Sequence, residues 1–293
     1  MNPDISSKCS CRLCPRDCGA PRTPAHPGWC GSDEGFSDYR VSSLMPHHGE
    51  ERCISGYAGS GTIFFSGCSL KCCFCQNYSI SHDHQGVRMT STRLLEKIKK
   101  LLDYGVHNLN LVTPSHYADR LPATIRTLRD TKTWQRRPVP VIWNSSAYET
   151  VESLRALADV VDVYLVDMKF HDPELAAGLA SAPDYPPVAY AAIREMLRQQ
   201  PLPAFDVGGL ILRGLVIRHL ILPGQTGDSF QILEELAQFV PADTPLSLMK
   251  QYRPRPGGHC GIVTEMNRRL FADEYHQVID FAKGIGFTHI LGQ

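Results

Sequence analysis

GTIFFSGCSLKCCFCQN, residues 61–77, joins a short apolar run to a tight group of cysteines. Ile, Phe and Thr favour extended backbone, so we expect a strand over residues 61–67. Cys68, Cys72 and Cys75 follow it with the spacing C-x3-C-x2-C. Because the binding sites of parallel α/β proteins lie at the carboxyl ends of strands, we expect the chemistry of the protein at this group.

Downstream of this segment, strand-like and helix-like patterns alternate. Further strands are predicted over 107–113, 139–144, 160–170, 215–223 and 245–252. Helices are predicted over 91–104, 118–130, 148–159, 189–200, 228–240 and 272–286. About six β/α units in order predict an α/β fold with a parallel sheet and helices packed outside it. The pattern leaves open whether the sheet is doubly wound or forms a partial or full (β/α) barrel.

The amino-terminal part of the chain has a different composition. Residues 1–60 are rich in Cys, Pro, Gly and Ser and show no sustained periodicity, which predicts an irregular segment held together by a metal. We therefore divide the chain into a Cys-rich lobe, residues 1–55, and a β/α core, residues 56–293.

Charge and hydropathy exclude several classes of protein. Thirty basic residues balance thirty acidic ones, so no net positive charge would attract nucleic acid or an anionic membrane. No apolar run approaches the length of about 18 residues that a membrane span needs. The first residues also lack the apolar stretch of a secretory signal, and we expect a cytoplasmic protein.

Eleven cysteines in a reducing compartment are expected to be metal ligands or catalytic groups rather than disulfides. Two of them, Cys53 and Cys260, are isolated and are predicted to be small buried apolar residues. Cys73 lies next to a member of the triplet, and we predict that it packs rather than ligates.

The triplet at Cys68, Cys72 and Cys75 predicts an iron–sulfur cluster. Three thiolates on a 4Fe-4S cube leave one iron without a protein ligand, whereas ferredoxin-type clusters take four cysteines. The alternative is zinc, which closes its site with four ligands. His82 and His84 lie near enough in sequence to complete such a site.

These features resemble the radical S-adenosylmethionine superfamily, and more narrowly its pyruvate formate-lyase activating enzyme-like branch. The resemblance extends over ISGYAGSGTIFFSGCSLKCCFCQNYSIS, NLNLVTPSHY, VDVYLVDMK and IRHLILPG, and includes CRLCPRDCG near the amino terminus. It implies that S-adenosylmethionine binds the open iron and is cleaved to a 5′-deoxyadenosyl radical that abstracts hydrogen. It also implies a low-potential electron donor of the flavodoxin or ferredoxin type, and a protein as a candidate substrate.

Residues at the strand ends are candidates for holding the cosubstrate. Where relatives carry Gly-Gly-Glu, this chain has Thr113, Ser115 and His116, and Asn144 with Ser145 ends the next strand. Further candidates are Asp167, Lys169, Arg218 and His219. Asp167 and Lys169 are two residues apart on a strand, so their side chains share a face, and the resemblance implies that such a pair contacts the cosubstrate. Adjacent residues of a strand point to opposite faces, but the pattern does not show whether Arg218 or His219 faces the site. Candidates for the entrance of the substrate site are Gln251, Tyr252 and Arg253.

A second metal site is predicted in the lobe. Cys11, Cys14, Cys18 and Cys30 supply four thiolates on a short segment rich in Pro and Gly, with Cys9 as a spare. Four ligands close a site, so we expect structural zinc or an auxiliary cluster.

Three functions follow as hypotheses. The first is a radical enzyme, either an activase that abstracts hydrogen from a glycine of a partner protein or an enzyme acting on another protein or a small molecule. The second is a zinc-binding interaction module without catalysis. The third is an electron carrier with a fully ligated cluster. The substrate, the reductant, the metal of the lobe and the oligomeric state stay open.

Overall fold

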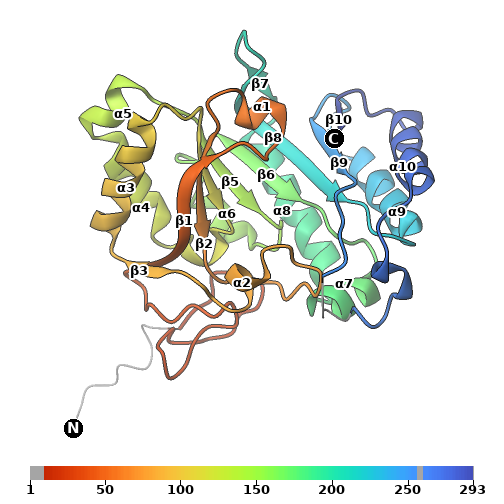
Figure 1. The fold of residues 1–293 in the computed structure, drawn as a ribbon, viewed down its shortest axis with the longest axis horizontal. Helices are drawn as coiled ribbons and strands as arrows, with labels where there is room; N and C mark the ends of the chain where they lie inside the picture. Colours follow the sequence, from red (N-terminus) through yellow and green to blue (C-terminus); the bar gives the residue numbers. More distant parts are fainter. Residues whose placement is uncertain (1–9, 256–259, 293) are drawn as a thin grey trace. The chain divides into compact units, whose positions relative to one another are not determined.

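The computed structural model describes residues 10–255 and 260–292, and it contains two compact units (Figure 1). The first unit comprises Met1–Ser69, Ser79–Asn144 and Glu149–Val161. The second unit comprises Leu70–Tyr78, Ser145–Tyr148 and Asp162–Gln293. The segment that carries the cysteine triplet therefore contributes to both units.

The first unit is built on a mixed sheet. Its strands follow the order β5 (Val141–Ser145), β4 (Leu109–Val112), β2 (Ser60–Phe65), β1 (Tyr39–His47) and β3 (Val87–Met89). Strands β2, β4 and β5 are parallel, whereas β1 runs antiparallel to β2 and to β3. The helices of this unit are α1 (Arg52–Ser55), α2 (Tyr78–Ser81), α3 (Ser91–Asp103), α4 (Leu121–Arg129), α5 (Lys132–Arg136) and α6 (Val151–Arg155).

Helix α3 shows how the sequence sets an element of this unit. The side chain of Thr90 accepts a hydrogen bond from the backbone N–H of Arg93, which caps the first turn. Leu94, Ile98 and Leu101 recur at helical spacing and are buried. Gly105, with φ +97°, follows the helix and allows the chain to turn towards β4.

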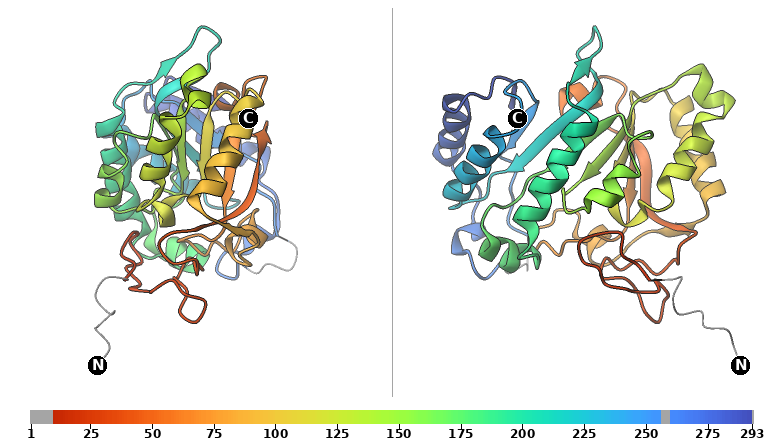
Figure 2. Two further views of the ribbon diagram at one scale, coloured as in Figure 1. Left: turned by 90° about the vertical axis from the view of Figure 1, so that its left-hand side faces the viewer. Right: turned by 180° about the vertical axis from the view of Figure 1, so that it is seen from behind.

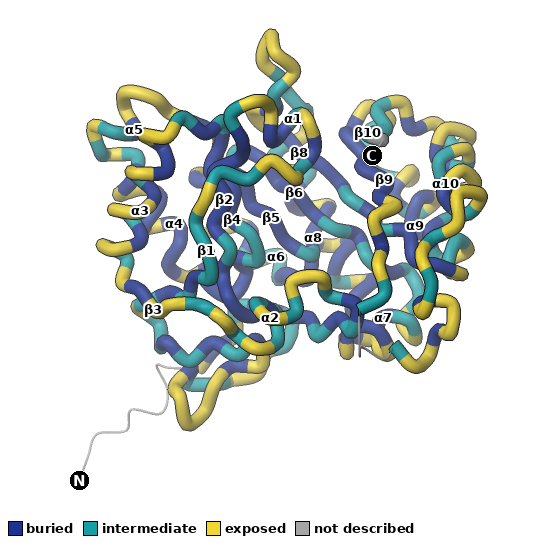
Figure 3. The backbone as a smooth tube through the Cα atoms, in the orientation of Figure 1, coloured by how far each residue is buried: buried dark blue, intermediate teal, exposed yellow. Residues whose placement is uncertain are grey.

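The second unit holds a parallel sheet. Its strands follow the order β10 (Ile290–Gly292), β9 (Leu246–Met249), β8 (Ile211–Leu220) and β6 (Val163–Asp167), and β7 (Ala204–Phe205) pairs antiparallel with β8. Its helices are α7 (Pro173–Ala180), α8 (Tyr185–Gln199), α9 (Thr226–Ala237) and α10 (Ala272–Gly284). Helix α8 runs beside β8 (Figure 2). Most strand residues of both sheets are buried (Figure 3).

The predicted α/β class with a mostly parallel sheet is confirmed. Each of the six predicted strands and six predicted helices is present, with ends that differ by a few residues. Neither strand order closes on itself, so neither sheet forms a full barrel. No helix in the described parts of the chain is long and apolar enough to cross a membrane.

The prediction that residues 1–60 are irregular is wrong for its last third. Residues 10–38 contain no helix or strand apart from an isolated bridge between Thr23 and His26, but Tyr39–His47 form β1. This strand lacks a clear alternation because most of its residues beyond Val41 are only half-buried. Its antiparallel pairing with β2, rather than its own pattern, defines it.

Candidate active site

Two of the three triplet cysteines lie in a loop of the second unit, residues 70–78, which we call the cluster loop. The backbone N–H groups of Lys71 and Cys73 donate to the carbonyl groups of Ala180 and Leu179, at 3.2 and 2.9 Å. A tight turn follows, in which the N–H of Cys75 donates to the carbonyl of Cys72. The loop is thus held against the carboxyl end of α7, with Cys72 buried and Cys75 half-buried.

Cys68 belongs to the first unit and comes shortly after β2. The preceding Gly67 has φ +89°, and a Cβ atom there would lie 2.3 Å from the carbonyl oxygen of Cys30. Only glycine fits this position, because backbone of the Cys-rich lobe lies directly against it. The irregular loops of the lobe accordingly gather at the carboxyl end of β2 (Figure 1).

An acid and two bases meet at the carboxyl ends of β6 and β8. Asp167 accepts from the Lys169 ammonium at 2.8 Å and from the Arg218 guanidinium at 2.7 Å. Asp167 and Arg218 are paired in register, so their side chains point to the same face of the sheet. Asp167 and Lys169, which the sequence places on one face, form an ion pair, and Arg218 joins them.

The charges of this group are fixed by one another. Burial raises the pKa of Asp167, but the cationic charges of Arg218 and Lys169 outweigh it and lower that pKa to about 2. Burial lowers the pKa of Lys169, but the charges of Asp167 and the Cys72 thiolate outweigh it and raise the pKa above its usual value. The group therefore carries one negative and two positive charges, with Lys169 close enough to Cys72 to interact with its thiolate.

His219 lies on the opposite face of β8. Its Nδ1 atom donates to the carbonyl of Met168 at 2.8 Å, and its Nε2 atom accepts from the hydroxyl of Ser229 on α9, also at 2.8 Å. Burial lowers its pKa to about 4, so the ring is neutral. Both nitrogen atoms are engaged on the helix side of the sheet, which corrects the prediction of His219 as a cosubstrate ligand and leaves Arg218 as the residue that faces Asp167.

The segment after β4 braces the first unit. Ser115 donates to Glu149, which also accepts from the indole N–H of Trp143 at 2.8 Å. His116 is buried and its Nε2 atom donates to the carbonyl of Ser66 at 2.9 Å. Burial lowers the pKa of His116 to about 3. The side chains of Ser115 and His116 are therefore bonded to other residues of the first unit. His116 fixes the backbone of Ser66, two residues before Cys68.

Thr113 differs from these two neighbours because its backbone is strained. It has φ +57°, an unfavourable value for a β-branched residue, and its N–H donates to the carbonyl of Asn144 at 2.9 Å. The strand end is thus held in a fixed and uncommon conformation. Thr113 stays a predicted cosubstrate contact.

The side chains of Asn144 on β5 and Asn110 on β4 both contact the carboxylate of Glu50. The amide of Asn144 lies 3.5 Å from Oε1 of Glu50, and the amide of Asn110 donates to the same oxygen at 3.1 Å. The in-register pairs Asn110 with Ile142 and Val112 with Asn144 put both asparagines on one face of the sheet. Glu50 was missed in the sequence because it lies in a connection with no motif, and the only signal was the pair of polar residues on otherwise apolar strands.

The four predicted ligands of the lobe are electrostatic neighbours. Cys11, Cys14 and Cys30 are buried, and Cys18 is exposed. Burial, followed by thiolate repulsion among these cysteines, raises the pKa of Cys14 to about 12. Burial likewise raises the pKa of Cys30 to about 11, against the lowering charge of Arg22. In the described parts of the chain no three His, Cys, Asp or Glu side chains are placed to hold one metal ion, so the lobe site stays a prediction, and Cys9 lies outside the described residues.

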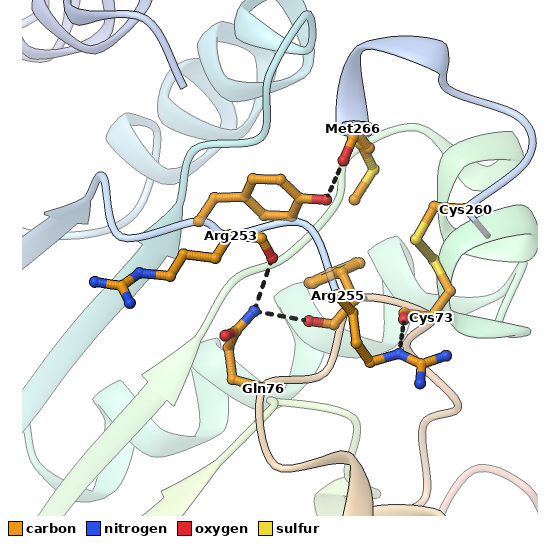
Figure 4. Close-up of a disulfide and its surroundings, with 8 residues drawn as sticks. Cys73, Gln76, Arg253, Arg255, Cys260 and Met266 are labelled. Carbon is orange, nitrogen blue, oxygen red and sulfur yellow. Dashed lines mark hydrogen bonds between the residues drawn. A yellow bond between two sulfur atoms is a disulfide. The ribbon is translucent and has the colours of Figure 1, made fainter. Parts of the chain in front are cut away.

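Cys73 and Cys260 form a disulfide with sulfur atoms 2.13 Å apart (Figure 4). This overturns the predictions that disulfides are absent, that Cys73 only packs and that Cys260 is an isolated apolar residue. The two residues are 187 positions apart, so no local pattern signals their pairing. Cys53 is half-buried and free, and burial raises its pKa to about 11.

The segment after β9 also contacts the cluster loop (Figure 4). The amide of Gln76 donates to the carbonyl of Arg253 at 3.0 Å, and Arg255 donates to the carbonyl of Cys73 at 3.3 Å. Tyr252 is buried against the ring of Phe74 and donates to the carbonyl of Met266. Of the residues predicted for the entrance of the substrate site, Arg253 and Tyr252 thus contact the loop, and Tyr252 is a packing residue there.

Comparison with known proteins points to iron–sulfur chemistry in the same segment. Residues 54–179, which include the whole triplet, match the family described as a 4Fe-4S single cluster domain. The chain is 28% identical over 281 residues to the uncharacterized protein MJ0674 of Methanocaldococcus jannaschii, a match that covers 94% of this chain and 74% of that protein. The family match supports a 4Fe-4S cluster in the segment that carries the triplet.

Two solved structures are similar to this one in fold. A structure of HydG, a maturase of the FeFe hydrogenase, superimposes with a TM-score of 0.49 at 16% identity, over 76% of this chain. Methylornithine synthase PylB gives a TM-score of 0.49 at 15% identity, over 77% of this chain and 68% of that one. The chain spans about half of the HydG chain, 48% of its length.

Proposed function

We propose that this protein is a radical S-adenosylmethionine enzyme, in which Cys68, Cys72 and Cys75 hold a 4Fe-4S cluster with one open iron. The observation that carries the proposal is the three-cysteine spacing inside the segment that matches a single-cluster domain. Three thiolates, rather than four, leave the iron that a cosubstrate requires.

The chemistry of the residues suits such a cluster, although no three Cys, His, Asp or Glu side chains of the described residues, the triplet included, are placed to hold one metal ion. Cysteines bind metals as thiolates, and a nearby cation stabilises the thiolate form. Lys169 supplies that cation beside Cys72, since the thiolate charge contributes to the raised pKa of the lysine. When bound and reduced, a cluster of this kind supplies the electron that cleaves the sulfonium of S-adenosylmethionine.

The charged group on β6 and β8 is proposed to hold the cosubstrate. Lys169 and Arg218 are cationic and about 18% and 13% exposed, so each retains solvent-facing surface in addition to its bond with Asp167. They offer donors to the carboxylate of an amino acid, and Asp167 remains an acceptor for its ammonium group. Thr113, after β4, and Asn144, near the end of β5, are proposed as further contacts.

The 5′-deoxyadenosyl radical abstracts hydrogen from a substrate. We propose that this substrate is the one used by the activase branch that the sequence resembles. The substrate would then be a glycine residue of a partner protein, and the product a glycyl radical. A different protein or a small molecule is the alternative. A glycyl radical gives a characteristic doublet in electron paramagnetic resonance spectra, so incubation with candidate glycyl-radical enzymes separates the two.

The primary test is anaerobic cluster assembly with iron and sulfide, then reduction with S-adenosylmethionine present. We expect 5′-deoxyadenosine from the wild type and from Cys53→Ala, a matched control because Cys53 is a free, half-buried cysteine outside the triplet. Cys72→Ala should lose both the iron and the product. Wild-type protein that binds zinc and no iron would support the interaction module, and a signal unaffected by S-adenosylmethionine would support the electron carrier.

A further inference from the structure

The segment of residues 68–75 contains one cysteine more than an open cluster can use. Four thiols lie within residues 68–75, and a cube takes four thiolate ligands in ordinary electron carriers. A fully ligated cluster has no iron left for a cosubstrate. Something must therefore keep one of these thiols away from the metal.

The structure shows which thiol is withheld. Cys73 is bonded to Cys260 (Figure 4), and Cys68, Cys72 and Cys75 take no part in this disulfide. The neighbouring side chains at 72 and 73 also have different surroundings. Cys72 is buried within electrostatic range of Lys169 and Tyr185, whereas Cys73 is half-buried beside Cys260.

We propose that Cys260 is a positioning residue, which bonds Cys73 and so excludes the fourth thiol from the cluster. This inference rests on the proposed function, and it assigns a role to a disulfide that the radical chemistry itself does not use. Its consequence is that coordination by three cysteines is maintained by a residue almost two hundred positions away in sequence, as the separation of 187 shows.

The bond forms by thiol–disulfide exchange with a low-molecular-weight disulfide. The thiolate of Cys73 or Cys260 attacks that disulfide and releases one thiol, and the other cysteine then displaces the second. Two cysteine thiols are oxidised and one disulfide is reduced to two thiols, so protons and electrons balance. A dithiol reductant reverses the reaction and frees Cys73 to compete for iron.

The position of the loop does not depend on the disulfide alone. The backbone of Cys73 is held by Leu179 and Arg255, and the guanidinium of Arg255 stacks 3.9 Å from the ring centre of Tyr78. The amide of Gln76 adds its bond to the carbonyl of Arg253. We expect these contacts to remain when both sulfur atoms are removed. The disulfide can therefore be tested for excluding the Cys73 thiol separately from fixing the position of the loop.

The test compares wild type with Cys260→Ser, Cys73→Ser and the double variant Cys73→Ser/Cys260→Ser. All four are purified anaerobically with their clusters and without added thiol. Alkylation and mass spectrometry first identify the linked peptides in the wild type. The readouts are the change that S-adenosylmethionine causes in the electron paramagnetic resonance spectrum of the reduced cluster, and the rate of 5′-deoxyadenosine formation.

We expect Cys260→Ser to lose most of the spectral change and at least tenfold in rate, because Cys73 is then free. Cys73→Ser and the double variant should stay within about twofold of wild type. The inference is overturned if Cys260→Ser behaves as wild type, if the double variant is as impaired as Cys260→Ser, or if Cys73 and Cys260 of the purified wild type are both alkylated. A cluster indifferent to S-adenosylmethionine in all four proteins would instead overturn the proposed function.

Discussion

The two cysteine groups of this chain offer the same kind of ligand but have different neighbours. In the lobe, Cys14 and Cys30 are buried beside other thiols, and burial raises the pKa of each to about 12 and about 11. In the cluster loop, Cys72 lies within range of the Lys169 ammonium. In the lobe, burial outweighs the charge of Arg22 and favours neutral thiols until a metal cation arrives, whereas the Lys169 ammonium interacts with Cys72 of the cluster loop.

This difference teaches that spacing alone does not describe a metal site. A buried thiol becomes a ligand only when it loses its proton, and the surroundings determine how readily that happens. We accordingly expect metal in the lobe to act on folding, and metal in the cluster loop to act on chemistry.

The largest effect is expected when one cysteine of each group is replaced by serine in separate variants. Cys72→Ser should reduce cluster iron and 5′-deoxyadenosine to background, a loss of at least 100-fold. Cys14→Ser should leave the response of the cluster to S-adenosylmethionine intact. Iron analysis and product assays on both proteins check this, and loss of product in both would merge the two groups into one functional site.

The lobe should show its own dependence on pH. The pKa of Cys14 is raised from 9.0 to about 12 in the folded protein. Its contribution to stability is therefore complete below pH 9 and is lost as the pH rises from 9 towards 12, by about 4 kcal/mol at most. Bound metal removes this loss because the bound form is already a thiolate. Melting temperatures measured at pH 8 and pH 10, with and without zinc, test this pH dependence.

Cys14→Ser is the matched control for that measurement. Without the Cys14 thiol, the fall in melting temperature above pH 9 should be smaller, and added zinc should protect less. Equal pH dependence in the two proteins would contradict the assignment.

On the side of the cluster loop, Asp167→Asn should destabilise the second unit by about 3 kcal/mol, because it leaves Lys169 and Arg218 without their shared anion. The pKa of Asp167 is lowered to about 2, so its stabilising effect is present above pH 4 and is lost as the pH falls towards 2. Urea unfolding at pH 7 and pH 3 should therefore show a difference between variant and wild type that narrows in acid.

The same substitution should weaken S-adenosylmethionine binding by about tenfold, consistent with loss of one charged hydrogen bond. Arg198→Gln is a control, because the exposed Arg198 forms a salt bridge with the buried Glu195 of the same helix, α8. Equal cosubstrate affinity in Asp167→Asn and wild type would separate the charged group from cosubstrate binding.

The smallest effect is expected at His219, which contributes only to folding. Its pKa is lowered to about 4 by burial, so the stability it supports is lost as the pH falls from 6.5 to 4. His219→Ala should cost about 2 kcal/mol at pH 7 and leave the rate of 5′-deoxyadenosine formation within twofold. Ser229→Ala, which removes one of the two bonds of the ring, should cost less, and a large change in rate in either variant would return His219 to the active site.

Most of the β/α core could be predicted from sequence because its elements are periodic and locally capped. The apolar spacing of α3 and the continuous run of β8 are examples, and both fell within a few residues of prediction. Strand β1 was not predicted, because most of its residues are half-buried and its pairing with β2 defines it. Only part of the charged group could be predicted: Asp167 and Lys169 lie two residues apart in sequence, whereas Arg218 joins them only through the register of β8 with β6.

The sequence by itself determined the cysteine triplet, the α/β class and the shared face of Asp167 and Lys169, because each depends on neighbours within a few residues. Only the tertiary structure decided that Arg218 rather than His219 faces Asp167, that His116 braces Ser66, and that Cys73 is bonded to Cys260. These contacts join segments that lie far apart along the chain. No local pattern encodes them, since they arise only when strands align in register and loops pack against one another.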